Sequence, residues 1–333
     1  MTQFVENLMS RASKLAKTIA LAEGTDVRAA KAAEILTQKN VCKVVLIGNE
    51  DEIKAKFPEI DFTGVSFDDP KTSEHRAEYA NTLYELRKAK GMTEEQALNI
   101  VTNNNMFYAC VALKRGDVDG VVGGAVFSSA DVSRAAFQVI KAAPGISSVS
   151  SCFVMVPPED FKYKKYPAYI FSDCAVIPYP TSDQLSDIVV AAADSAKKIC
   201  EMDPKIAMLS FSTKGSANHE SVEKVRFAYQ KVREEHPEIV VDGELQLDAS
   251  LVDSVAKQKA PGSPVAGKAN VLVFPNLDAG NIGYKIAQRF GNCMAIGPIM
   301  QGLALPVNDL SRGCVAEDIA AVAAITALQS VKD

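Results

Sequence analysis

The sequence has no large excess of either charge and no apolar run long enough to cross a membrane, and each absence excludes a class of protein. The formal net charge is −5 and charged residues make up 23% of the chain, which argues against a general nucleic-acid-binding or membrane-surface role. The longest apolar helix-like segment, 319–328, is far shorter than the ~20 residues that a transmembrane helix needs. Because residues 1–15 also lack the apolar core of a secretory signal, we expect a soluble, cytoplasmic protein.

Metal-ligand and disulfide patterns are equally scarce. The seven cysteines are scattered and form no C-x-x-C pair, which is typical of reduced thiols in a cytosolic protein. The three histidines, His75, His219 and His236, lie far apart in the sequence, and none belongs to a ligand motif. We therefore expect neither a metal site nor a bound cofactor.

The common nucleotide-binding motifs are also missing. No G-x-G-x-x-G pattern follows an expected strand, so a nicotinamide-binding Rossmann site has no support. The segment 262–268 has the spacing of a P-loop up to its lysine, but Ala269 stands where a serine or threonine would bind Mg²⁺. The expected strand also follows this segment, whereas a P-loop connects a strand to a later helix. We do not expect nucleotide hydrolysis.

What the chain does contain is a regular alternation of helix-like and strand-like segments. With 333 residues, 47% of them hydrophobic, it has the length of about two domains with sizeable cores. The expected helices are 4–17, 27–38, 73–90, 128–141, 183–200, 219–235, 281–290 and a last one from about 315. The expected strands are 18–23, 42–47, 118–125, 149–156, 168–172, 205–211, 270–275 and 293–297. Such alternation predicts an α/β protein with mostly parallel sheets covered on both faces. A domain boundary is expected at Ala143-Pro144-Gly145.

The segment 297–318 combines turn residues, an arginine and several carboxylates. The preceding strand is expected to end at Gly297-Pro298, and a loop containing Arg312 leads to a helix with Asp318 in its first turn. A loop that leads to a helix N-terminus can bind an anion, because backbone N–H groups and the helix dipole converge there. The segment is therefore either a phosphate site or an ordinary strand–loop–helix connection with an acidic first turn.

Two further segments have a similar layout. In 278–285, expected between a strand and a helix, glycines such as Gly283 would let the backbone approach an anionic ligand. In 123–129, two glycines precede Ser128, which with its neighbour is a candidate helix N-cap. Arg134 falls within the next two turns. For 278–285, a tight turn without a ligand is an equally good interpretation.

Five long motifs in the expected order resemble the phosphate acetyltransferase (phosphotransacetylase) family, and the resemblance runs nearly end to end. They are MLSFSTKGSA (208–217), DGELQLDA (242–249), APGSPVAGKANVLVFP (260–275), LDAGNIGYK (277–285) and PVNDLSRGC (306–314). The resemblance implies an isocitrate/isopropylmalate dehydrogenase-type fold, with α/β domains 1–145 and 146–297, a return of 298–333 to the first domain, and an interdomain cleft. It also implies a homodimer. The apolar C-terminal helix could form a subunit contact or could be buried within one subunit.

The resemblance further implies the reaction acetyl-CoA + phosphate ⇌ acetyl phosphate + CoA, with no metal. Starting from acetyl phosphate, a CoA thiolate would attack the acetyl carbonyl directly in a ternary complex. Asp318 would accept the thiol proton, Arg312 would hold the phosphoryl oxygens, and Ser311 would donate a hydrogen bond. The further substrate-binding residues that it implies are Arg87, Arg134, Ser128, Asn281, Gly283 and Cys314. Without the resemblance, we would interpret Arg87 as an ordinary solvated residue.

Two of these assignments need particular conditions. An aspartate with an ordinary pKa near 3.9 is a poor base for a thiol, and a neighbouring arginine lowers that pKa further, whereas burial raises it. Cys314 could be a nucleophile with a lowered pKa near Arg312 and a helix N-terminus, but no histidine is nearby in sequence to act as its base. We therefore expect Cys314 to be a wall residue of the site.

Two other functions remain open. A phosphate butyryltransferase would share the fold and the chemistry but would need a roomier acyl pocket. A non-catalytic acyl-CoA-sensing module, like the related domain appended to some malic enzymes, would need no catalytic set. The presence of Ser311, Arg312 and Asp318 together disfavours the sensor.

Overall fold

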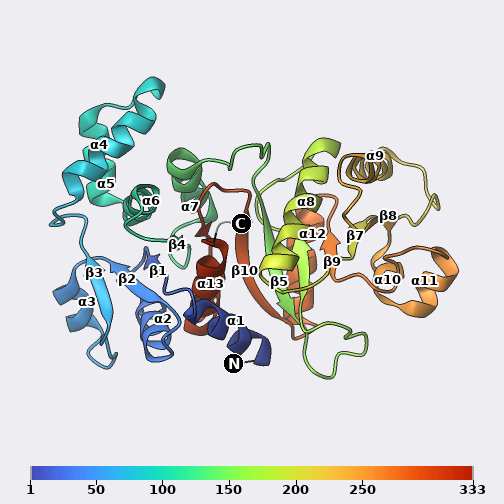
Figure 1. The fold of residues 1–333 in the computed structure, drawn as a ribbon, viewed down its shortest axis with the longest axis horizontal. Coiled ribbons are helices and arrows are strands. Elements are labelled where there is room, and N and C mark those ends of the chain that lie inside the picture. The colour runs from blue at the N-terminus through green and yellow to red at the C-terminus, as the bar shows by residue number, and fades with distance from the viewer. Residues whose placement is uncertain (1, 332–333) are drawn as a thin grey trace. The chain divides into compact units, whose positions relative to one another are not determined.

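The computed structural model describes residues 2–331, which fold into two compact α/β units (Figure 1). The first unit comprises the chain up to Pro144 together with the chain from Leu303 onward, and the second runs from Gly145 to Gly302. No helix within the described residues is both long and apolar enough to span a bilayer.

The first unit is built on a five-stranded, fully parallel sheet in the order β11-β4-β1-β2-β3. Its central strands are apolar and buried, as expected when helices cover both faces of a sheet. The strands are β1 (Thr18–Leu21), β2 (Lys43–Ile47), β3 (Val65–Asp68), β4 (Gly120–Val122) and β11 (Val307–Asn308).

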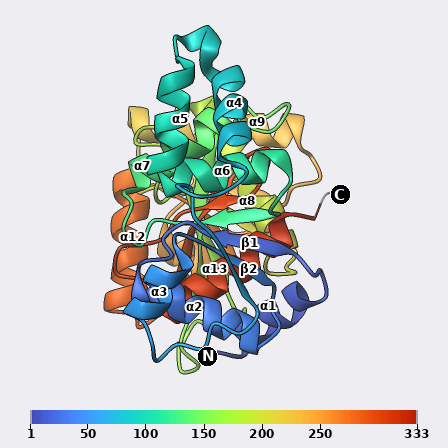
Figure 2. The ribbon, with the colours of Figure 1, turned by 90° about the vertical axis from the view of Figure 1, so that its left-hand side faces the viewer.

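Helices cover both faces of this sheet (Figures 1 and 2). On one side lie α1 (Gln3–Ser13), α2 (Val27–Gln38), α3 (Glu50–Lys56) and α13 (Ala316–Gln329). On the other lie α4 (Arg76–Arg87) with the 3₁₀ turn Lys88–Lys90, α5 (Glu94–Asn103), α6 (Asn105–Arg115), and α7 (Ser129–Ala135) with the π-turn Ala136–Ile140. The helices α4 and α5 form a hairpin that projects from the unit (Figure 2).

The alanine-rich helix α13 is buried over most of its length and packs on α2, α1 and the sheet. Small side chains let neighbouring helices approach closely. Of the two possibilities left open for this helix, burial within its own unit is therefore the one that the structure shows.

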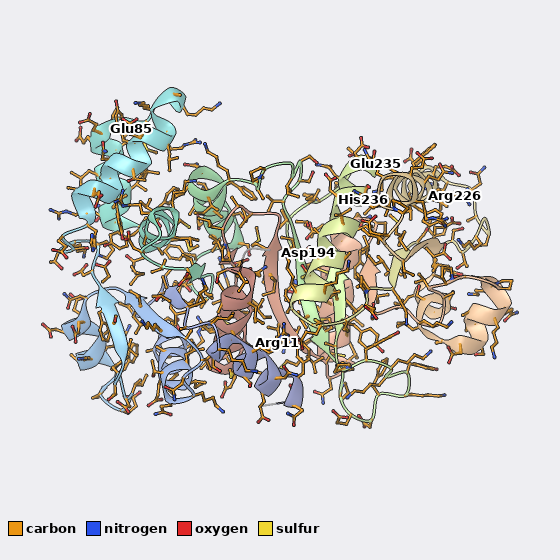
Figure 3. All side chains as sticks on the ribbon, in the orientation of Figure 1. Arg11, Glu85, Asp194, Arg226, Glu235 and His236 are labelled. Carbon is orange, nitrogen blue, oxygen red and sulfur yellow. The ribbon has the colours of Figure 1, made fainter. Side chains whose placement is uncertain are left out.

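The second unit contains a mixed six-stranded sheet in the order β10-β5-β6-β9-β7-β8. The pairs β10–β5 and β5–β6 are antiparallel, and the remaining pairs are parallel. The strands are β5 (Ser150–Val156), β6 (Tyr169–Ser172), β7 (Ile206–Leu209), β8 (Val241–Leu245), β9 (Val271–Val273) and β10 (Met294–Gln301). The helices are α8 (Ser182–Lys198), α9 (Glu220–Glu235), α10 (Leu247–Leu251), α11 (Asp253–Lys259) and α12 (Leu277–Arg289). Arg226 on α9, labelled in Figure 3, binds Glu244 at the end of β8.

Several predicted boundaries are wrong. The helix expected at 4–17 ends at Ser13, and the strand expected at 118–125 comprises only Gly120–Val122. The strand expected to end at Gly297-Pro298 continues as β10 to Gln301, because a register shift between Ile296 and Ile299 accommodates the proline on this edge strand. The helix expected at 281–290 begins four residues earlier, at Leu277, because Asn276 caps it by accepting the Ala279 N–H (2.9 Å).

Candidate active site

The carboxyl ends of three neighbouring strands in the first unit, β1, β4 and β11, lead into the segments 22–28, 123–129 and 309–315. The last two of these contain residues that the sequence singled out. In open parallel sheets, ligands bind at the carboxyl ends of the strands. This edge is therefore the natural place for a site.

Glu23, directly after β1, binds the loop that follows β4. Its Oε2 accepts the N–H groups of Gly124 (3.0 Å) and Ala125 (2.8 Å), and its Oε1 accepts those of Val126 and Phe127 (2.7 Å each). The anion that the 123–129 loop binds through its backbone is thus the protein's own buried carboxylate. A ligand at this loop would have to use side chains, and sequence reasoning missed Glu23 altogether.

Asp309, directly after β11, packs against the same loop. A Cβ added at Gly124 would lie 2.1 Å from Asp309 Oδ1, and Gly124 has φ +113°, so only glycine fits there. Burial raises the pKa of Asp309 to about 6, against the opposing effect of the Ser129 hydroxyl and the Leu310 N–H. Within the described part of the chain, its Oδ1 has no hydrogen-bond partner.

Arg28, in the first turn of α2, connects this loop to the segment that carries the predicted catalytic residues. Its Nη2 donates to the carbonyl of Ala125 (2.8 Å), and its Nη1 donates to the carbonyl of Arg312 (2.7 Å). Arg28 was not among the predicted site residues, because nothing in the local sequence indicates a partner 284 positions away.

Ser311 and Arg312 lie exposed on the loop before α13, whereas Cys314 is buried. Burial raises the pKa of Cys314 to about 11, although the Arg28 guanidinium, with Nη1 3.9 Å from the sulfur, opposes the shift. The suggestion that this thiol has a lowered pKa is therefore wrong. A thiol that stays protonated is a weak nucleophile, which agrees with the expected role as a wall residue.

Asp318 lies in the first turn of α13, and its Oδ2 accepts the Val315 N–H (3.0 Å). Its pKa is raised, mainly by burial and further by the neighbouring Glu317 carboxylate, while the Val315 hydrogen bond opposes the shift. Of the two opposing influences expected for this residue, burial therefore outweighs any effect of Arg312. A raised pKa makes Asp318 a better proton acceptor than an ordinary aspartate.

Ser128 is the N-cap of α7, as predicted, with its Oγ accepting the Asp131 N–H (3.2 Å). The Ser128 hydroxyl also donates to Asp131 Oδ2 (2.6 Å), and Arg134 Nη1 pairs with Asp131 Oδ1 (3.0 Å). The Arg134 side chain is 57% exposed. A surface pair of this kind is weak, so Arg134 is free to exchange Asp131 for an anionic ligand.

Arg87 ends α4 at the projecting hairpin. With Lys90, Gln96 and Asn99 it lines a cavity of about 430 Å³. Its Nε is buried and has no hydrogen-bond partner among the described residues. A buried donor without a partner is costly, and two cations beside two amides suit an anionic group.

Asn281 and Gly283 belong to the second unit and lie within α12, so the interpretation of 278–285 as a turn is wrong. A Cβ at Gly283 would come within 3.0 Å of the Phe274 ring, and one at Gly280 within 2.2 Å of the Asp173 carbonyl. These glycines let the helix pack closely on its own unit. Asn281 Nδ2 donates to the Cys174 carbonyl (3.1 Å). The role of Asn281 and Gly283 in substrate binding stays a prediction.

The fold defines the class of protein. The chain superposes on the solved structure of 4-hydroxythreonine-4-phosphate dehydrogenase from Klebsiella pneumoniae with a TM-score of 0.54 and 12% identity. The match covers 94% of this chain and 100% of the dehydrogenase chain. A likeness at this identity concerns the fold alone, and it confirms the predicted dehydrogenase-like α/β class.

The chain belongs to the phosphate acetyl/butaryl transferase family, whose sequence model matches residues 3–327. A phosphate acetyltransferase of Acetivibrio thermocellus is 51% identical over 327 residues, which is 98% of each chain. The crystal structure of a phosphotransacetylase from Streptococcus pyogenes covers 99% of both chains, with a TM-score of 0.89 and 40% identity. The predicted resemblance is therefore confirmed.

Proposed function

We propose that the protein catalyses the reversible reaction acetyl-CoA + phosphate ⇌ acetyl phosphate + CoA. The observation that carries this proposal is the 51% identity to a phosphate acetyltransferase over 98% of both chains. The raised pKa of Asp318 is the supporting feature of the site, because the reaction needs a proton acceptor for a thiol.

In the direction of acetyl-CoA synthesis, the CoA sulfur attacks the acetyl carbonyl of acetyl phosphate and phosphate leaves. A thiol with a pKa of ~8.5 is only a few per cent ionised at neutral pH, so a positioned base is useful. Asp318 accepts the thiol proton as the S–C bond forms. General-base catalysis of this kind contributes roughly 10²–10⁴-fold.

The charge that develops on the leaving phosphate needs a cationic partner. Arg312 takes this role, because its planar guanidinium can bind two phosphoryl oxygens at once. Ser311 donates a hydrogen bond to the thiol sulfur or to the acetyl oxygen. No metal or cofactor is required, since phosphate is already a good leaving group.

The CoA substrate carries phosphate groups of its own. Arg87, with its unpartnered Nε and its cavity, is the stronger anchoring candidate, and Arg134 is the second. Ser128, Asn281 and Gly283 complete the proposed substrate-binding set.

The acetyl group passes directly between the substrates, without an acetyl-enzyme. The high pKa of Cys314 favours this route, because a protonated thiol does not attack. Cys314→Ala should therefore keep substantial activity. Parallel-line initial-rate kinetics, or an acetylated protein trapped with acetyl phosphate alone, would contradict a ternary-complex mechanism.

We further propose a cytoplasmic homodimer that binds neither nucleic acid nor membranes. Helix α12 exposes Ile282 (57%) and Ile286 (53%), and its C-cap Phe290 (90%) follows at the same four-residue interval, which places the three on one face. An exposed apolar stripe of this kind suits a second copy of the chain. Light scattering should give a dimer for the native chain and a shift toward monomer for Ile286→Asp. A native monomer at micromolar concentration would contradict the dimer.

Thiol release from acetyl-CoA and phosphate tests the activity. Release that requires phosphate supports the transferase, and its absence would favour the acyl-CoA-sensing module. Comparing acetyl with butyryl phosphate as donors then distinguishes the acetyltransferase from a phosphate butyryltransferase.

A further inference from the structure

We propose that Arg28 is a positioning residue for Arg312, acting by fixing the backbone of the loop from Ser311 to Cys314. The proposal rests on the proposed role of Arg312 in holding phosphate. Arg28 itself has no part in that role, since its donors are used by the protein.

The Arg28 side chain is held by Asp26, a residue of the same helix end. Asp26, the N-cap of α2, accepts the Arg28 N–H at Oδ1 (2.9 Å). The Asp26 carboxylate also accepts Arg28 Nε at Oδ1 and Nη2 at Oδ2 (2.9 Å each). This two-point pairing orients the guanidinium plane, and the Asp26 hydrogen bond raises the pKa of Arg28.

The remaining donors of the same guanidinium join two loops. Nη1 reaches the Arg312 carbonyl (2.7 Å) and lies 3.5 Å from the Cys314 carbonyl, while Nη2 reaches the Ala125 carbonyl (2.8 Å). The Ala125 N–H is in turn held by Glu23. The Arg312 backbone is thereby attached to two anchored points of the sheet edge, α2 and the 124–127 loop.

Arg312 depends on this attachment because its side chain is exposed and has no hydrogen-bond or ion-pair partner among the described residues. The backbone therefore determines the point from which this guanidinium reaches a ligand, and with it the part of the site that the guanidinium can serve. Displacing a catalytic group by about 1 Å can lower a rate about 10²-fold. A lysine at position 28 keeps the charge but replaces the planar fork with a single ammonium group, which cannot serve Asp26 and both carbonyls in this geometry.

The test is a double-mutant cycle of Arg28→Lys and Arg312→Lys, with steady-state kinetics and thermal melting of each variant. Arg28→Lys should lower kcat/KM for acetyl phosphate about 10–100-fold and weaken product inhibition by phosphate, while KM for CoA stays within about twofold. When Arg28→Lys is added to Arg312→Lys, kcat/KM should fall by less than about threefold, because the side chain that Arg28 positions is already impaired.

Arg76→Lys is the matched control, because Arg76 Nη1 also donates to a backbone carbonyl, that of Lys71 (2.6 Å), away from the proposed site. It should leave the kinetics unchanged. If Arg28→Lys melts too low to assay, Arg28→Gln, which keeps one donor, takes its place in the cycle.

Unchanged kinetics in the position-28 variants would overturn the positioning role, and so would an equal fall in kcat/KM with arginine or lysine at position 312. Neither result would affect the proposed phosphate-binding role of Arg312. A lower melting temperature with unchanged kcat/KM would do the same and assign Arg28 to stability. If Arg312→Lys alone has no effect, the phosphate role of Arg312 fails first, and the inference fails with it.

Discussion

Asp318 shows how a residue of ordinary chemistry becomes useful through its surroundings. An exposed aspartate would be a poor acceptor for a thiol proton, but burial at the start of α13 raises its pKa, and Glu317 adds to the effect. Burial also raises the pKa of Cys314, four residues earlier, to about 11. For a thiol the effect on reactivity is the reverse, because the group stays protonated and is a weak nucleophile. One short segment thus contains a more basic carboxylate and a less reactive thiol.

Asp318→Asn should lower kcat by about two to four orders of magnitude and change KM for CoA only modestly. The amide keeps the size of the side chain but cannot accept the thiol proton. Steady-state rates of both forms across mildly acidic to mildly basic pH provide the measurement. A variant with near-wild-type kcat throughout would show that the base lies elsewhere.

Asp309 provides a pH-dependent test of the site's electrostatics. Its pKa of about 6 lies above the value of 3.8 for a free side chain, so the fold favours its protonated form. This contribution to stability is fully present below about pH 4 and is lost as pH rises through about 6. The size of the loss follows from ~1.4 kcal/mol per pKa unit and reaches about 3 kcal/mol.

Asp309→Asn removes this titration. Relative to the native chain, the variant should therefore gain stability between about pH 4 and pH 7, as measured by urea unfolding at several pH values. If the difference in unfolding free energy between the two proteins does not change between about pH 4 and pH 7, Asp309 is already ionised in the folded state over this range, and the account of its raised pKa is contradicted.

Buried carboxylates at strand ends recur as structural elements in both units. Glu23 after β1 holds the N–H groups of 124–127, and Asp173 after β6 accepts those of Ala175, Val176 and Ile177. At the end of β8, Glu244 accepts the Gly215 N–H (2.8 Å) and two donors of Arg226. Glu23 and Glu244 thus each anchor a loop from another part of the chain, and Asp173 anchors the loop that directly follows it.

Glu244→Gln tests this anchoring. Burial alone would raise the pKa of Glu244, but hydrogen bonds from Arg226 and the Gly215 N–H outweigh it and lower the pKa to about 2. Its stabilisation is present above about pH 4.5 and is lost as pH falls toward 2. Because the Arg226 side chain is 28% exposed, the pair is only partly buried, and its loss should cost about 1.5–3 kcal/mol at neutral pH, which is measurable by urea unfolding.

Glu223→Gln is the control, since Glu223 pairs with the same arginine from a 40% exposed position. It should cost less than about 1 kcal/mol. Equal losses in the two variants, or a Glu244→Gln loss that persists near pH 2, would contradict the anchoring role.

Sequence predicted many of the elements whose signals are local, although it missed the strand β3 and the helices α3, α5, α6, α10 and α11. Helix α2 has the predicted bounds, because Asp26 supplies a cap and the apolar pattern is regular. The two-residue strand β11 was missed, since it exists only through its pairing with β4. Arg312 and Asp318 were found through a family motif, whereas Glu23, Arg28 and Asp309 were not, because their roles arise from contacts with distant parts of the chain.

At the scale of the whole molecule, the chain leaves its first unit at Pro144 and returns to it at Leu303. The return places the motif 306–314 beside β4 and α2 of the N-terminal part. The first unit therefore contains Ser311, Arg312 and Asp318 together with the cations Arg87 and Arg134. The chemistry proposed above is carried out chiefly by residues of this unit, and its central residue is Arg312.

The kinetics of Arg312→Lys test that claim most directly. A lysine keeps the charge but loses the bidentate fork, so kcat/KM for acetyl phosphate should fall by about 10²–10³-fold, and product inhibition by phosphate should weaken. The melting temperature should stay close to that of the native chain, because Arg312 is exposed and its carbonyl contact with Arg28 is unaffected. Unchanged kinetics in the lysine variant would contradict the phosphate-binding role, and a collapsed melting temperature would assign Arg312 to the fold.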